Sequence, residues 1–150
     1  MDGERTAATA GVVACLLTAG AVAAPYVLLP ASALQYVARY YGAGPVNPLA
    51  LGLLGLLGAI IFASGRERRS DPDLVAGIML SVGLFSVVVA GLWALGFDPV
   101  AVGATDAIDF MRTHRWSVLA GTGLELVAAL WYAAARDLVP VPGLGSATGR

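Results

Sequence analysis

The sequence has no lysine, only one histidine and only one cysteine among its 150 residues. A single cysteine, Cys15, excludes an intrachain disulfide framework and a cysteine-based zinc site. Charged residues make up only 13% of the chain, and the formal net charge is −1. So little charge excludes the strongly basic surface with which proteins bind nucleic acid.

Recognisable catalytic motifs are also missing from the sequence. It contains no glycine-rich phosphate loop, no nucleophile elbow and no histidine or cysteine set at metal-binding spacing. The one histidine, His114, has only Asp106 and Asp109 nearby, and their spacing defines no ligand set. We therefore expect no metal, no cofactor and no enzymatic activity, and we expect His114 to be a polar anchor beside Trp116 at the membrane interface.

Long apolar runs are what the sequence does contain. Hydrophobic residues make up 58% of the chain, whereas soluble domains contain about 45–50%. A membrane-spanning helix needs about 20 mostly apolar residues, and every backbone amide inside a bilayer must be satisfied within its own segment. The sequence therefore predicts one all-α domain over residues 1–150, an integral membrane four-helix bundle with spans at residues 7–29, 48–64, 74–95 and 116–135.

Helix-start signals support these boundaries. Asn47-Pro48 and Asp71-Pro72 each place a capping residue directly before a first-turn proline. Pro25 is expected to kink the first helix. A cleaved signal peptide is the alternative for that segment, because "AVAAP" contains an A-x-A-like site. The leader "MDGER" carries two acids and one arginine rather than a positive region, so we expect an uncleaved helix.

The two outer loops are long enough to hold structure of their own. "SALQYVARYYGAG" (residues 32–44) and "DPVAVGATDAIDFMRTHR" (residues 98–115) have apolar residues at helical spacing. Both predict short amphipathic helices at the outer interface, with an ordinary loop as the alternative for the second. Residues 136–150 are rich in proline and glycine and predict an irregular cytoplasmic tail.

Arginine is distributed unequally between the two sides of the predicted bundle. Six arginines fall on the side of the termini and three on the other. The positive-inside rule then places both termini in the cytoplasm of a multi-pass protein in the cell membrane. The cluster Arg66, Arg68 and Arg69 could bind anionic lipid headgroups; a simple topology signal is the alternative.

Small residues predict how the helices pack. In a bilayer, helices associate through close contact of small side chains. Gly52, Gly55 and Gly58 form one strip on the second span, and Gly121 lies in the same row as Glu125 on the fourth. These residues predict a tight bundle; contacts in a homo-oligomer or a membrane complex are the alternative use.

Glu125 is the chief candidate for chemistry, because it lies near the middle of the fourth span. A charged side chain at that depth costs about 2.5–3.5 kcal/mol on insertion scales. Its row also contains Gly121, Ala129 and Ala133, so we expect Glu125 to face the bundle interior. There a neutral carboxyl can hydrogen bond to nearby hydroxyl groups, for which the candidates are Thr18, Ser81, Ser86 and Thr122. An interhelical hydrogen bond is the expected role, and the proton or cation site of a small transporter or channel is the alternative.

Several stretches resemble a family of small haloarchaeal four-helix membrane proteins of uncharacterised function. The resemblance rests on "APYVLLP", "YYGAGPVNPLA", "FASGRERRSDPDLVAGIML", "GLWAL" and "HRWSVL", and it spans residues 24–135. It implies an archaeal plasma membrane and a salt-rich setting, and no catalytic residues. Together with the residues above, it suggests a non-enzymatic structural or accessory subunit.

Overall fold

The computed structural model describes residues 2–42, 46–96 and 106–139, and all regular structure in these ranges is helical. The elements are α1 (Asp2–Leu28), the 3-10 turn η1 (Ala31–Ala33), α2 (Leu34–Gly42), α3 (Leu49–Arg66), α4 (Pro72–Leu95) and α6 (Asp106–Ala134). Of these, α1, α3, α4 and α6 are long and apolar enough to cross a membrane. The predicted all-α class is confirmed, and the chain is a multi-pass membrane protein.

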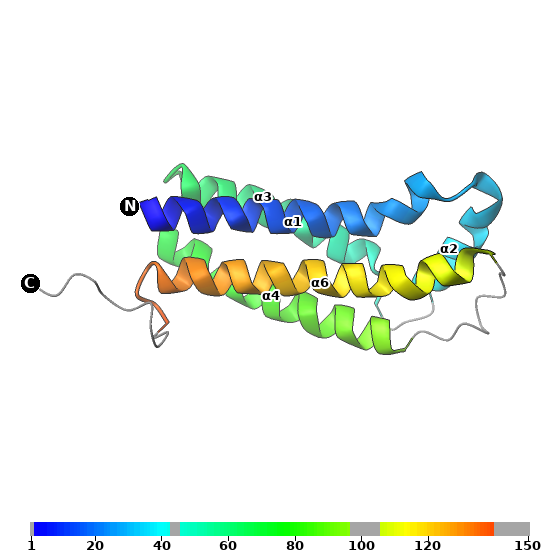
Figure 1. Ribbon diagram of the computed structural model, residues 1–150. Coiled ribbons are helices and arrows are strands. Elements are labelled where there is room, and N and C mark those ends of the chain that lie inside the picture. The colour runs from blue at the N-terminus through cyan, green and yellow to red at the C-terminus, as the bar shows by residue number, and fades with distance from the viewer. Residues whose placement is uncertain (1, 43–45, 97–105, 140–150) are drawn as a thin grey trace, which may run out of the picture.

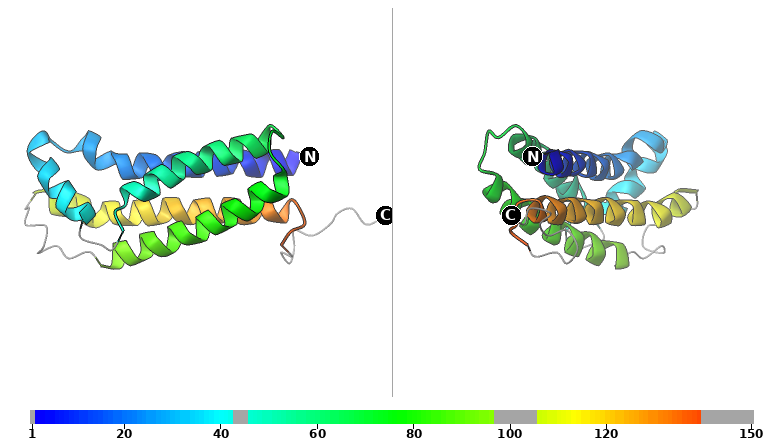
Figure 2. Two further views of the ribbon diagram at one scale, coloured as in Figure 1. Left: turned by 180° about the vertical axis from the view of Figure 1, so that it is seen from behind. Right: turned by 60° about the vertical axis from the view of Figure 1, so that its left-hand side comes forward.

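The four long helices form an antiparallel bundle (Figure 1). Helix α1 packs against α3 and α6, and α4 packs against the same two helices, so the bundle closes as a ring. Helix α1 begins and α6 ends at one end, which we call the terminal end. Helix α2 lies across the other end, which we call the α2 end, and the two views of Figure 2 show the same arrangement.

Local capping explains where α3 and α4 begin. The Asn47 side chain accepts a hydrogen bond from the Leu49 amide at 3.0 Å, and the Asp71 side chain accepts one from the Asp73 amide at 2.9 Å. These bonds satisfy amides that have no partner inside the helix. Both helices therefore begin within two residues of the sequence prediction.

Helices α1 and α6 are longer than the predicted spans. Helix α1 begins at Asp2 rather than residue 7, and it continues through Pro25. Hydrophobicity defines only the part of a helix that the bilayer covers, so polar turns beyond it escape such a prediction. In α6, residues 106–115 form the first turns of one 29-residue helix and not a separate amphipathic helix.

This difference in the second outer loop has a local cause. No proline or glycine lies between Asp106 and Trp116 to end a helix. Met111 and His114 are also buried against the bundle, so these turns gain packing energy as part of α6. Residues 98–105 of the predicted segment lie outside the described residues, as does the tail from residue 140.

The first outer loop does contain the predicted short helix. Helix α2 buries Val37, Tyr40 and Tyr41 against the end of the bundle. Its hydrogen bonds and ring contacts, described below, close the α2 end with aromatic side chains.

Candidate functional site

Glu125 lies in the interior of the bundle and is only 1% exposed. Helix α6 carries it to a junction with α1, where the Thr18 and Cys15 side chains lie beside its carboxyl group. Helix α3 contributes Gly55, on which a Cβ atom would lie 3.3 Å from Glu125 Oε1. The carboxyl group therefore lies where three helices meet.

The glycines named from the sequence lie at close approaches between these helices. A Cβ on Gly55 would lie 2.8 Å from the Cys15 carbonyl oxygen, and a Cβ on Gly121 would lie 2.7 Å from Thr18 Oγ1. Gly52 faces Val22, and Gly58 faces the Cys15 sulfur and Met79. Because real Cβ atoms essentially never come closer than 3.0 Å to such atoms, larger residues at 55 and 121 would separate the helices.

The hydroxyl groups near Glu125 bond to their own helices. Thr18 donates to the Ala14 carbonyl at 3.2 Å, and Thr122 donates to the Leu119 carbonyl at 3.0 Å. A helical serine or threonine commonly makes this bond to the preceding turn. Neither oxygen of Glu125 has a hydrogen-bond partner of normal geometry among the described residues. The Thr18 and Cys15 side chains of α1 nevertheless lie beside the carboxyl group, so the expected interhelical bond stays a prediction.

The two candidate serines of α4 have different surroundings. Ser86 is 1% exposed, and its hydroxyl has no partner among the described residues. Ser81 is exposed on the outside of the bundle and donates to the Gly77 carbonyl at 3.0 Å. Of the two, only Ser86 belongs to the polar interior.

His114 lies in a second polar site, at the α2 end. It is 5% exposed, and its Nε2 atom is 2.7 Å from the Ala21 carbonyl oxygen of α1. In an uninterrupted helix the amide of residue 25 would bond to that oxygen, but Pro25 has no N–H. His114 therefore supplies the hydrogen bond that Pro25 cannot make.

The remaining groups around His114 also bond to backbone carbonyls. The Tyr40 hydroxyl lies 3.1 Å from the Met111 oxygen and 3.3 Å from His114 Nδ1. Tyr41 donates to the Val22 carbonyl at 2.6 Å. Arg115 donates to the Ala94 carbonyl at 2.9 Å, in the last turn of α4. With Trp93 and Phe110 against the same rings, these side chains tie α2 to α1, α4 and α6.

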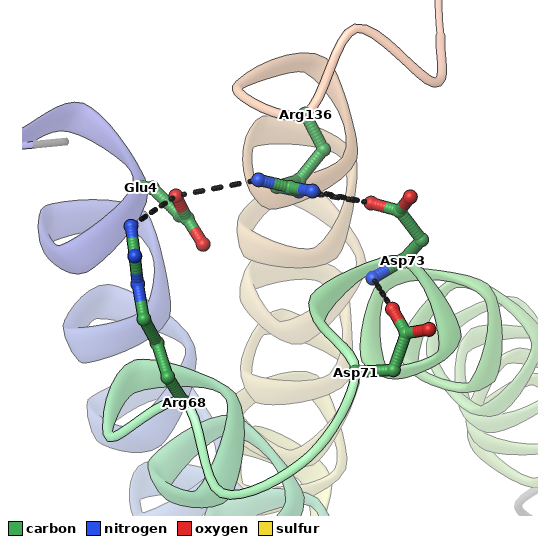
Figure 3. A network of polar contacts seen from close by, with 5 residues as sticks. All are labelled: Glu4, Arg68, Asp71, Asp73 and Arg136. Atoms are coloured by element: carbon green, nitrogen blue, oxygen red, sulfur yellow. Dashed lines mark hydrogen bonds and ion pairs between the residues drawn. The ribbon is translucent and has the colours of Figure 1, made fainter.

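Charged residues cluster at the terminal end (Figure 3). Arg136 is 2.8 Å from the Asp73 carboxylate, which raises the pKa of the guanidinium, and 3.6 Å from Glu4. Arg68 is 4.0 Å from Glu4. These contacts join the turn after α6 to α4 and α1, and they join the turn after α3 to α1.

The three predicted headgroup arginines differ in their surroundings. Arg69 pairs with Glu67 at 2.7 Å. Arg66 and Arg68 line a pocket of about 150 Å³ with Arg5, Glu4 and Gly65. Sequence reasoning placed Arg66, Arg68 and Arg69 in one group and missed Arg5, whose position next to α3 depends on the packing of α1.

Sequence reasoning also missed the role of His114, although a signal for it exists. Pro25 inside an apolar helix leaves the carbonyl four residues earlier without its usual partner. Inside a membrane such a group must find another donor. His114 and Pro25 lie 89 positions apart in the chain, so the sequence alone does not show that they meet.

A family model described as a family of unknown function (DUF7548) matches residues 1–137. Two curated relatives, the phospho-N-acetylmuramoyl-pentapeptide-transferases of two Streptococcus pneumoniae strains (Hungary19A-6 and Taiwan19F-14), are each 39% identical over 64 residues. That match covers 43% of this chain but only 19% of each transferase, so the chain matches less than a fifth of their length. No solved structure matches the chain.

Proposed function

The chain belongs to DUF7548, a family of unknown function, and from its geometry we propose that it is a non-enzymatic membrane component, a structural or accessory subunit. The observation that carries this proposal is the close helix packing around Glu125. Gly55 and Gly121 bring α3 and α6 against the backbone of α1, at Cys15 and Thr18. This arrangement suits a rigid bundle.

A flux measurement tests the proposal. The purified protein would be reconstituted in liposomes containing a pH-sensitive dye, and proton flux would be driven by a potassium gradient with valinomycin. We expect the same flux as in protein-free liposomes, for the wild type and for Glu125→Gln alike. Flux that requires the wild-type carboxyl would overturn the structural proposal.

The second candidate function is a small transporter or channel that uses Glu125. One observation favours it: both carboxyl oxygens are buried without a partner among the described residues. Buried polar groups are usually hydrogen bonded, and exceptions concentrate at sites with a function. Repeating the flux assay with sodium- and potassium-sensitive dyes extends the test to cations.

If the chain is a subunit, the particle extracted from the membrane should be heavier than one chain. Protein extracted from its native membrane in mild detergent should appear in native mass spectrometry above the 15.3 kDa of one chain. Multiples of that mass would indicate a homo-oligomer, and other masses a complex with different subunits. A monomer alone would contradict the subunit role.

The likeness to the transferases gives no support for an enzyme. Their name describes transfer of phospho-N-acetylmuramoyl-pentapeptide, but the match covers only 19% of each of them. Activity of a whole enzyme does not follow from so small a part.

We place the chain in the plasma membrane with the terminal end in the cytoplasm. Arg5, Arg66, Arg68, Arg69 and Arg136 belong to that end, against Arg39, Arg112 and Arg115 near the other, which supports this orientation. In a Cys15→Ser background, Gln35→Cys should react with a membrane-impermeant maleimide on intact cells, and Ser70→Cys should not. The reverse pattern would invert the topology.

A further inference from the structure

The small pocket at the terminal end lies between the first turn of α1 and the last turn of α3. Its lining is Glu4, Arg5, Gly65, Arg66 and Arg68. The lining therefore includes three arginines and one carboxylate. The Glu4 carboxylate lies 4.0 Å from Arg68 and 3.6 Å from Arg136, which is outside the lining. The pocket keeps an excess of positive charge that no described ion pair cancels.

The backbone of α3 leaves its arginine side chains available for a ligand. Carbonyls at the end of a helix normally need donors, and arginine often supplies them. Here the amides of Glu67, Arg68 and Arg69 bond to the carbonyls of Ala63, Gly65 and Ser64 at 3.0–3.1 Å. Since the backbone already satisfies these three carbonyls, the guanidinium groups are not needed to cap them.

The conformation of Arg68 is a second, independent observation. Its φ of 55° lies in the left-handed region, where glycine is the usual residue at the end of a helix. That conformation costs an L-residue about 1–2 kcal/mol. An arginine at this position, in a residue that lines the pocket, is an outlier that points to a function.

We propose that this pocket binds one phosphate group. Guanidinium is the side chain best suited to phosphate oxygens, because it presents paired donors in a plane. The pocket volume of about 150 Å³ leaves room for a group the size of one phosphate. The pocket lies at the ends of two helices that are apolar enough to span a membrane. An anionic lipid headgroup and free phosphate both offer the required chemistry.

Thermal unfolding of the full chain in detergent micelles tests this site, which does not depend on the role of Glu125. The unfolding midpoint would be titrated with phosphatidylglycerol, with phosphatidylcholine and with inorganic phosphate. We expect phosphatidylglycerol to raise the midpoint and phosphatidylcholine to do so much less. If inorganic phosphate raises the midpoint as much as phosphatidylglycerol does, the ligand is a soluble phosphate. If only phosphatidylglycerol raises the midpoint, the ligand is the lipid headgroup.

Matched variants separate a defined pocket from general surface charge. Arg5→Gln and Arg66→Gln should each weaken binding about fivefold, the effect expected from about 1 kcal/mol for each arginine near a lipid surface. Arg69→Gln is the control, because it removes the same charge from the same turn but Arg69 pairs with Glu67 and does not line the pocket. It should leave binding unchanged.

The unliganded midpoint of each variant shows whether it folds, so a lost shift can be assigned to lost binding. If Arg69→Gln and Arg66→Gln weaken binding equally, binding depends on the general surface charge and not on the pocket, and the proposal is overturned. Absence of a shift with both phosphatidylglycerol and inorganic phosphate would overturn it as well.

Discussion

Two charged residues occupy positions where helices normally end in glycine. Arg68 and Asp137 have φ values of 55° and 57°. At each of these positions, the amide of the residue itself bonds to the carbonyl three residues earlier. The amide of the next residue bonds to the carbonyl five residues before it, as in a Schellman motif. Aspartate tolerates this left-handed conformation better than arginine, so most of the strain lies at Arg68.

Replacing Arg68 by glycine should therefore stabilise the bundle. Relief of the left-handed conformation is worth about 1–2 kcal/mol, and the greater freedom of glycine in the unfolded chain offsets about 0.5–1 kcal/mol of it. The ion pair lost with Glu4 is long, at 4.0 Å, and the Arg68 side chain is 60% exposed, so the pair adds little. Unfolding in phosphate-free detergent should show the gain.

Arg69→Gly is the control for that prediction. Arg69 has no positive φ, so glycine there brings only the entropic cost and should lower stability. A gain from both substitutions would show that charge, and not backbone conformation, is responsible.

The sequence predicted the interior position of Glu125 better than it predicted the hydrogen-bond partners of its carboxyl group. Its row with Gly121 placed it in the interior, because small residues mark helix contacts. Its hydrogen bonds were not predictable, since Thr18 and Thr122 can bond either across helices or to their own preceding turn. Only the packed structure shows that both hydroxyl groups bond locally.

At the scale of helix pairs, α6 offers a matched test of close packing. A Cβ on Gly121 would meet Thr18 Oγ1 at 2.7 Å and Thr18 Cα at 3.2 Å, whereas a Cβ on Gly123 would meet nothing within 4 Å. Gly121→Ala should lower the unfolding free energy by about 1–3 kcal/mol through overpacking. Gly123→Ala should raise it by up to about 1 kcal/mol, because alanine is the better helix former.

Chemical or thermal denaturation of the two variants in one detergent measures this difference. An equal change in unfolding free energy for both substitutions would contradict the prediction, because it would mean that α1 and α6 do not pack closely at Gly121.

The hydrogen bond from His114 joins α6 to the carbonyl that Pro25 leaves unpaired in α1. His114→Leu should destabilise the wild type by about 1–3 kcal/mol, because a buried acceptor loses its donor. In a Pro25→Ala background the amide of residue 25 can bond to Ala21 instead, so the same change should cost less. A double-mutant cycle measures the coupling, and additive effects would show that the histidine and the proline act independently.

Helix α2 makes the stability of the α2 end depend on pH. Burial raises the pKa of Tyr40 and Tyr41 above the ordinary tyrosine value of about 10. Above that pH, tyrosines in the unfolded chain lose their protons while the buried ones keep theirs, so stability is present below pH 10 and falls as the pH rises further. Tyr41→Phe should show a shallower decline between pH 9 and 11 than the wild type, after about 1 kcal/mol of loss at neutral pH from the missing bond to Val22.

Denaturation midpoints at several pH values check this slope. Tyr36→Phe on the same short helix provides a comparison, because Tyr36 is only partly buried. An equal change in slope for both variants would mean that the buried hydroxyl of Tyr41 is not the cause.

For the whole molecule, Cys15 reports on global unfolding. It is the only cysteine in the chain, and it is fully buried at the junction of α1 with α3. A thiol-reactive dye should therefore label the folded protein very slowly and the unfolded protein fast. Rapid labelling of folded protein in lipid would contradict the close packing of α1 against Gly55 and Gly58.

The whole fold was largely predictable, because one physical requirement dominates it. A bilayer demands helices of about 20 apolar residues, and the sequence displays four such runs. The first turns of α6 and of α1 were less predictable, since their polar residues lie beyond the apolar runs. The order of the helices around the ring depends on packing between segments, so it cannot be predicted from any one segment. The same packing brings Arg5 and Arg66 to one pocket.

The pairing of Pro25 with His114 also has an evolutionary consequence. The carbonyl of Ala21 needs a donor only while residue 25 is proline, so the two positions share one requirement across 89 residues. Family members that lack this proline should be free to vary at the histidine, and members that keep it should retain a hydrogen-bond donor there. An alignment of the family would test this covariation, and independent substitution at the two positions would argue against it.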